Sequence, residues 1–152
     1  MNERSPSLAV ELEALRMFIV NRPLIEGYLV PEMFDDALVR STFELLESNA
    51  DVVSARDHGT PEEAELLARL AVDPSEAEVN DVLIRLATEV GRSVLADLEA
   101  RARSSADPLA FVEVITWLKL EVDDLRRSKV EVEKLHQLLV WLRDQRRESD
   151  RG

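Results

Sequence analysis

Few residues of this chain are of the types that perform catalysis or hold a metal ion. The 152 residues include no cysteine and only two histidines, His58 and His136. His58 lies in a segment typical of an exposed turn, whereas His136 stands beside Leu135 in a helical pattern. Neither has the further nitrogen or sulfur ligands, at suitable spacing, that a zinc site requires. We therefore expect no bound metal and no cofactor.

Pairs of adjacent carboxylates are the other candidates for metal or acid–base chemistry. Neighbouring residues on a helix point in different directions, so such pairs do not converge on one ion. A di-iron centre needs Glu-x-x-His on two helices, and the segment Glu133–His136 is a single copy. Neither a glycine-rich phosphate loop nor a nucleophile elbow is present. We therefore expect no catalytic residue and no enzymatic activity of this chain alone. The pairs are Asp35-Asp36, Glu62-Glu63 and Asp123-Asp124.

Composition predicts an all-α protein of the cytoplasm. Hydrophobic residues make up 45% of the chain, glycines number four, and β-branched residues stand at helical spacing. No apolar run approaches the roughly 20 residues of a membrane-spanning helix, and the first residues lack the pattern of a secretory signal. The absence of cysteine leaves no disulfide framework. We expect no membrane partner.

The net charge of −12 is unevenly distributed. Residues 1–74 contain six arginines and fifteen acidic residues, a charge of −9, whereas residues 128–152 have a charge of +1. Affinity for nucleic acid depends mainly on neutralising phosphates, and the acidic first half opposes this. We therefore expect no direct binding to nucleic acid.

Short helices separated by prolines are predicted for a first domain, residues 1–74. Proline at position 23 ends the first helix, because it disfavours helical geometry in the preceding residue. Pro31 and the run Thr60-Pro61-Glu62-Glu63 are typical helix starts. The segment 48–60 is the least regular. The predicted helices are 8–21, 31–48 and 60–72.

Two long helical patterns follow in residues 75–152, at 78–103 and 109–147. Their apolar residues recur at steps of three and four, the period of one helix face. Ser75 and Glu78 form a predicted capping box, and Pro108 starts the return helix. Gly91 indicates a close helix crossing. We expect this second domain to be an antiparallel helical hairpin with an extended C-terminal helix, following the small bundle.

The order of several short segments along the chain provides an indication of function. In the first half they are Glu13–Leu15, Asn21–Leu24, Pro31–Phe34, Arg40–Phe43 and Glu65–Val72, and in the hairpin Arg101–Arg103, Asp107-Pro108, Leu118–Glu121 and Leu125–Arg127. In order and spacing they resemble the C-terminal helicase-binding domain of bacterial DnaG-type primases, which is related to the N-terminal domain of DnaB-type helicases. The resemblance covers about residues 8–127. The chain departs from the family in its C-terminal extension and in lacking the zinc-binding and catalytic primase domains.

The resemblance implies that the hairpin docks on the N-terminal domain of the replicative DnaB-type helicase and recruits primase to the replication fork, while the bundle modulates the helicase. The hairpin has more apolar positions than one two-helix seam can bury, and Trp117 fits the core and an exposed anchor equally well. Aromatic and apolar side chains on a helix are preferred interface anchors. The expected contact residues are Phe111, Val114, Trp117, Leu118, Leu120 and Leu125, with Arg126 and Arg127 at their edge and Trp141 in the extension.

Two other interpretations remain open at this point. The chain also has the pattern of a free-standing helical regulator or adaptor that dimerises, or sequesters another protein, through its hairpin. It also fits a structural fragment of a helicase N-terminal domain. We expect a monomer or a weak dimer.

Overall fold

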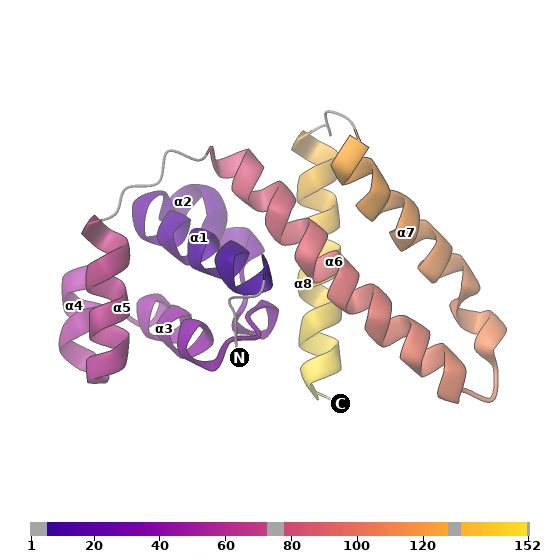
Figure 1. The fold of residues 1–152 in the computed structure, drawn as a ribbon, viewed down its shortest axis with the longest axis horizontal. Coiled ribbons are helices and arrows are strands. Elements are labelled where there is room, and N and C mark those ends of the chain that lie inside the picture. The colour runs from indigo at the N-terminus through magenta and orange to yellow at the C-terminus, as the bar shows by residue number, and fades with distance from the viewer. Residues whose placement is uncertain (1–5, 73–77, 128–131, 152) are drawn as a thin grey trace. The chain divides into compact units, whose positions relative to one another are not determined.

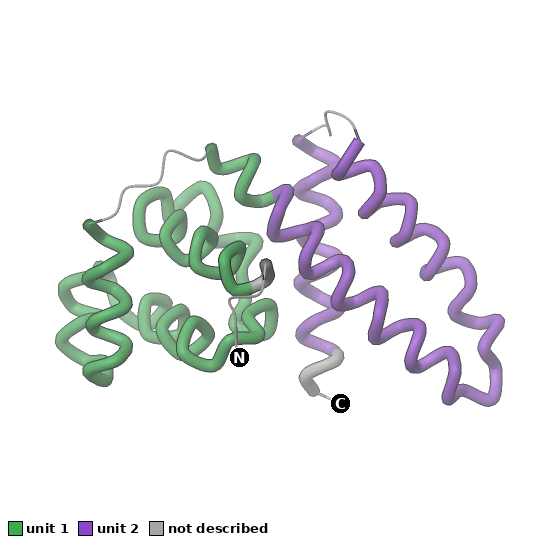
Figure 2. The backbone as a smooth tube through the Cα atoms, viewed as in Figure 1, with its two compact units in different colours: residues 1–83 green, residues 84–152 purple. Residues whose placement is uncertain are grey.

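The computed structural model describes residues 6–72, 78–127 and 132–151, and every regular element in these ranges is helical, as predicted (Figure 1). The chain divides into two compact units, unit 1 (residues 1–83) and unit 2 (residues 84–152) (Figure 2). The predicted joint at residues 74 and 75, and the Ser75 half of the capping box, lie outside the described residues. No helix of the described ranges is long and apolar enough to cross a membrane.

Unit 1 is built from short helices, and the start of α5 is encoded locally. Helix α5 has the predicted start and end. Its capping box is complete, because Thr60 Oγ1 accepts the Glu63 N–H at 3.1 Å and Glu63 Oε1 accepts the Thr60 N–H at 2.9 Å. The elements are α1 (Pro6–Val20), α2 (Arg22–Ile25), the 3₁₀ turns η1 (Glu26–Tyr28) and η2 (Pro31–Met33), α3 (Ala37–Glu47), α4 (Val52–His58) and α5 (Pro61–Val72).

The predicted helix start at Pro31 is wrong. Pro31 begins only a 3₁₀ turn, and α3 begins after Asp36, whose carboxylate accepts the Val39 N–H at 3.0 Å. The cause is distant in sequence: the buried Glu11 carboxylate accepts the N–H groups of Asp35 and Asp36 at 3.0 and 3.1 Å. These bonds tie the loop to α1 and place the first turn of α3 after it.

The segment 48–60, predicted to be the least regular, contains a helix. Asp51 caps α4 by accepting the Ser54 N–H at 2.8 Å, and Ala55 of this helix is fully buried. Small polar residues at a helix start are equally typical of loops, so the sequence pattern did not distinguish a short helix from a loop in this segment.

The core of unit 1 centres on three phenylalanines. The Phe43 ring lies 4.9 Å, centroid to centroid, from both Phe18 and Phe34, and all three side chains are buried. Aromatic pairs at this separation are stabilising beyond the apolar area they bury. They join α1, the end of η2 and α3 into one core.

The first two helices of unit 2 form the predicted hairpin. Helix α6 (Val79–Ser104), whose first five residues belong to unit 1, is followed by the turn η3 (Pro108–Phe111) and the antiparallel α7 (Val112–Arg127) (Figure 1). A Cβ atom added to Gly91 would lie 2.7 Å from Val122 Cγ2. The predicted close crossing at Gly91 is therefore confirmed, and it lies between α6 and α7.

The prediction of one continuous return helix is wrong. Helix α7 ends at Arg127, and α8 (Val132–Arg151) folds back beside it. The rings of Trp117 and Trp141 lie 4.7 Å apart, whereas the same residues in one helix would be about 36 Å apart at about 1.5 Å per residue. An ion pair of 2.9 Å between Arg146 and Asp97 joins α8 to α6. In the described ranges, unit 2 is thus a hairpin with a third helix packed on it.

Candidate functional site

Exposed apolar side chains gather on α7 and the turn before it. Their exposed fractions are 79% for Leu109, 51% for Val112, 38% for Trp117 and 60% for Leu120, and we call these four residues the α7 strip. Single exposed apolar residues are normal, but several on one element indicate an interaction surface. The α7 strip is therefore the candidate site of unit 2.

Two of the residues predicted to contact a partner lie on the buried face of α7. Leu118 is 0% exposed and Leu125 is 7% exposed, and with Val122 they pack inside unit 2. Their spacing of four and three residues is that of a single buried face. Neither leucine is accessible to a partner in this structure, so neither belongs to the candidate site.

The other predicted contact residues are at least partly accessible. Trp117 and Leu120 belong to the α7 strip, and Arg126 is exposed. Arg127 forms an exposed ion pair of 3.1 Å with Asp123. Such a pair contributes little to stability, so its guanidinium can exchange this carboxylate for one on a partner. The half-buried members are Phe111, Val114 and Trp141.

A tryptophan pair supports the strip from the neighbouring helix. Trp141 of α8 meets Trp117 of α7 with an interplanar angle of 75°, an edge-to-face arrangement. Edge-to-face pairs contribute about 0.5–1.5 kcal/mol beyond their buried area. The contact favours the observed orientation of the partly exposed Trp117 ring. The sequence placed both tryptophans as separate candidates and contained no indication that they meet.

Two charged side chains make contacts between the helices of the hairpin in unit 2. Lys119 lies 3.4 Å from Glu99, and the Arg101 guanidinium lies 5.7 Å from the centre of the Phe111 ring. The first contact links α6 to α7, and the second links α6 to the turn η3 before it.

The residues that were candidates for chemistry have structural roles or stay scattered. Within the described ranges, no group of three or more His, Asp or Glu residues is placed to hold a metal ion. His58 Nδ1 lies 2.8 Å from the Ser54 carbonyl, one turn earlier in α4. Burial raises the pKa of Glu11, although the N–H groups of Asp35 and Asp36 oppose the shift. The Thr60 N–H lowers the pKa of Glu63, as expected for a capping carboxylate.

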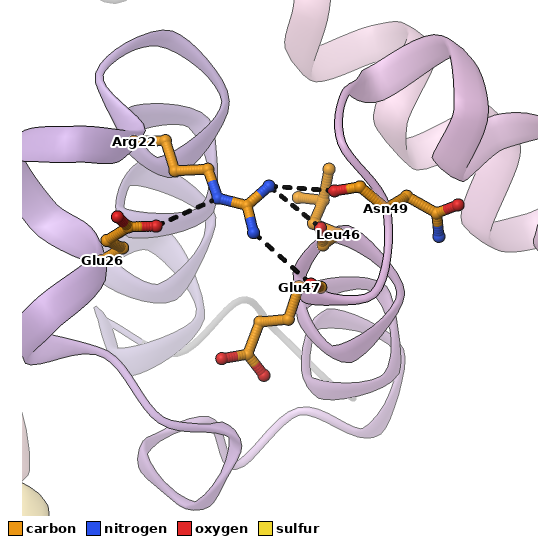
Figure 3. Close-up of polar contacts among 5 residues, drawn as sticks. All are labelled: Arg22, Glu26, Leu46, Glu47 and Asn49. Carbon is orange, nitrogen blue, oxygen red and sulfur yellow. Dashed lines mark hydrogen bonds and ion pairs between the residues drawn. The ribbon is translucent and has the colours of Figure 1, made fainter.

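The Asn21–Leu24 segment, part of the resemblance described above, stabilises unit 1. Arg22 Nη1 donates to the carbonyl oxygens of Leu46 at 3.2 Å and Asn49 at 3.0 Å, and Nη2 donates to that of Glu47 at 3.4 Å (Figure 3). Its Nε donates to Glu26 at 3.2 Å. The guanidinium thus donates to carbonyl groups at and just beyond the end of α3, among them that of Leu46, which also accepts the Asn49 N–H at 3.2 Å. These contacts assign Arg22 a role in stabilising unit 1.

Comparisons with protein-family models, with curated proteins and with solved structures found no match to this chain. The resemblance to helicase-binding domains accordingly stays a prediction from the sequence. What the described residues offer chemically is apolar surface on a rigid helix pair, supported by a fixed aromatic contact. Such a surface is suited to packing against another helix.

Proposed function

We propose that this chain is a protein-interaction module that binds the N-terminal domain of a replicative DnaB-type helicase through the α7 strip, and so couples primase to the replication fork. The observation that supports this proposal most directly is the exposure of Trp117 and Leu120 on a helical hairpin. The order of sequence segments described above supports the choice of partner. The net charge of −12 is consistent with action through a protein, not through the DNA backbone.

The energetics of the strip are adequate for a specific contact. Fully burying a leucine-sized side chain contributes about 1.5–3 kcal/mol relative to leaving it exposed. Leu120, at 60% exposure, has most of that contribution still to gain from a partner. Trp117 gains less area, but its orientation is already fixed by Trp141, so little side-chain entropy is lost on binding.

Calorimetric titration of the full chain with the N-terminal domain of the helicase encoded in the same genome tests the proposal. We expect Trp117→Ala and Leu120→Ser each to weaken binding by about tenfold or more, since truncating a hot-spot residue of an interface costs about 2 kcal/mol or more and about 1.4 kcal/mol is tenfold. Matched controls are Val53→Ser and Leu24→Ser, which remove side chains of 68% and 60% exposure from unit 1. Leu118→Ala is unsuitable, because it would open a cavity in the core.

The proposal is wrong if wild-type protein does not bind the helicase domain, or if both strip variants bind as tightly as the controls. Sedimentation analysis then distinguishes the alternative function. A wild-type dimer that Leu120→Ser dissociates would identify the chain as a self-associating regulator.

A further inference from the structure

A shallow groove in unit 1 lies between α3 and α5, and none of its lining residues is a predicted partner contact. Its volume is about 230 Å³, and it is lined by Leu38, Pro61, Glu62, Glu65, Leu66 and Arg69. Sites for cofactors and drug-sized ligands usually measure about 300–1,000 Å³. The groove is thus of a size for one or two side chains of a partner.

The groove has an apolar floor that one partner residue can cover. Leu66 is buried at its base, and Leu38, in the first turn of α3, remains 38% exposed. Pro61 closes the end of the floor at the start of α5. An apolar side chain laid on these three residues would remove from water most of the apolar surface that Leu38 now exposes.

The polar residues of the groove are ordered along α5. Counted from Glu62 as position i, Glu65 is at i+3, Leu66 at i+4 and Arg69 at i+7. These four residues therefore share one face of α5. At about 1.5 Å per residue, Glu62 and Arg69 are separated by about 10 Å along the helix axis. The groove therefore has an acidic end and a basic end, and this order imposes a direction on whatever binds.

Anionic ligands are disfavoured at the acidic end. The positive end of α5 is occupied by its own capping box, in which Glu63 accepts the Thr60 N–H. Glu62 and Glu65 add two exposed carboxylates, and residues 1–74 have a net charge of −9. A phosphate or an acidic peptide would meet repulsion there, whereas a lysine or arginine would be attracted.

We propose that this groove binds a short amphipathic helix of a partner protein, with an apolar anchor on Leu38 and Leu66 and a lysine or arginine facing Glu62 and Glu65. An acidic residue of that helix, about two turns from the basic one, faces Arg69. Laying an apolar helix face into a groove between helices is a recurring mode of peptide recognition. This second surface lies in unit 1 and does not depend on the α7 strip or on the helicase as partner.

Titration of the full chain with synthetic helical peptides tests the proposal. The first peptide has one leucine with lysines one turn to one side and glutamates one turn to the other. The second has the two charge types exchanged, and the third replaces the leucine by serine. Binding is followed by fluorescence anisotropy of the labelled peptide at low salt, where electrostatic pairing is least screened.

The variants are chosen to leave the fold intact. The double variant Glu62→Lys/Glu65→Lys inverts the acidic end, and Leu38→Ser removes apolar floor. The control Glu44→Lys makes the same substitution once, at an exposed position of α3 that does not line the groove, and so gives half the charge change of the double variant. Far-UV circular dichroism verifies the helicity of each variant.

We expect the first peptide to bind the wild-type chain more tightly than the other two. The double variant should bind it at least about tenfold more weakly and should prefer the charge-exchanged peptide, since inverted charge pairs repel. Glu44→Lys should change the affinity by less than about twofold. The proposal is overturned if no peptide binds, if the serine peptide binds equally well, or if Glu44→Lys weakens binding as much as the groove variants do.

Discussion

Replacing Arg22 by methionine tests how far one side chain stabilises unit 1. Methionine keeps the length and apolar stem of the arginine but removes its charge and all its donors. The substitution deletes the hydrogen bonds to the carbonyl groups of Leu46, Glu47 and Asn49 at the end of α3. It also deletes the contact of the guanidinium with the Phe18 ring, whose centre lies 4.8 Å away.

The expected loss follows from these contacts. Each of the two shorter hydrogen bonds, to Leu46 and Asn49, contributes about 0.5–1.5 kcal/mol. A cation at a helix C-terminus adds about 0.3–1 kcal/mol, and the cation–ring contact about 0.5–1 kcal/mol. The exposed pair with Glu26 adds little. Because the Arg22 side chain is 30% exposed and water replaces part of these contacts, we expect Arg22→Met to lower the free energy of unfolding by about 2–3 kcal/mol.

Urea unfolding followed by far-UV circular dichroism measures this loss. Arg22→Lys should lose less, because lysine keeps the charge but lacks the planar fork that reaches several carbonyl groups at once. Arg56→Met, at an exposed position of α4, is the control and should change the free energy of unfolding by less than about 0.5 kcal/mol. A loss for Arg22→Met no larger than that of the control would refute the capping role that we assign to this guanidinium.

Four further predictions concern stability and titration. Gly91→Ala should lower the melting temperature, because overpacking against Val122 costs about 1–3 kcal/mol, and adding Val122→Ala should restore part of the loss. Thr60→Ala should cost about 1 kcal/mol in chemical unfolding. The lowered pKa of Glu63 means that its stabilising contribution is present above its ordinary pKa and is lost as the pH falls through the lowered one, so the stability gap between wild type and Glu63→Gln should shrink on acidification. The pH dependence expected for Glu11 has the opposite sign. Its raised pKa stabilises the folded state at pH values below the ordinary glutamate pKa, and this stabilisation is lost as the pH rises through the raised pKa. Carbon NMR titration should find the Glu11 carboxyl group above, and Glu63 below, the ordinary range.

Features encoded by neighbouring residues could be predicted from the sequence. Helix α5 begins at Pro61 and ends at Val72 as expected, because its cap, first-turn proline and first-turn acids are contiguous. The α6–α7 hairpin follows from two periodic patterns around one break, and Gly91 marks their crossing because few other residues permit so close an approach. In each case the structure is determined by residues close in sequence, or by the lack of a side chain at Gly91.

Features set by distant contacts could not be predicted. The start of α3 depends on Glu11, about 25 residues earlier, whose carboxylate holds the loop before Asp36. The apolar period continues from Leu125 of α7 to Leu135 of α8, and the intervening sequence has neither glycine nor proline, so the pattern resembled one helix. Leu118 and Leu125 were wrongly assigned to partner contact for a related reason, since periodicity identifies an apolar face without saying which neighbour covers it.

The placement of the tryptophans has an optical consequence. Both lie in unit 2, whereas the single tyrosine, Tyr28, lies in unit 1. Light at the red edge of the aromatic band therefore excites unit 2 selectively, and the two indoles are close enough for their transitions to couple in the near-ultraviolet. A ligand on the α7 strip should change this emission without any attached dye, whereas no indole lines the α3–α5 groove. The chain thus has an intrinsic reporter for one of its two candidate surfaces.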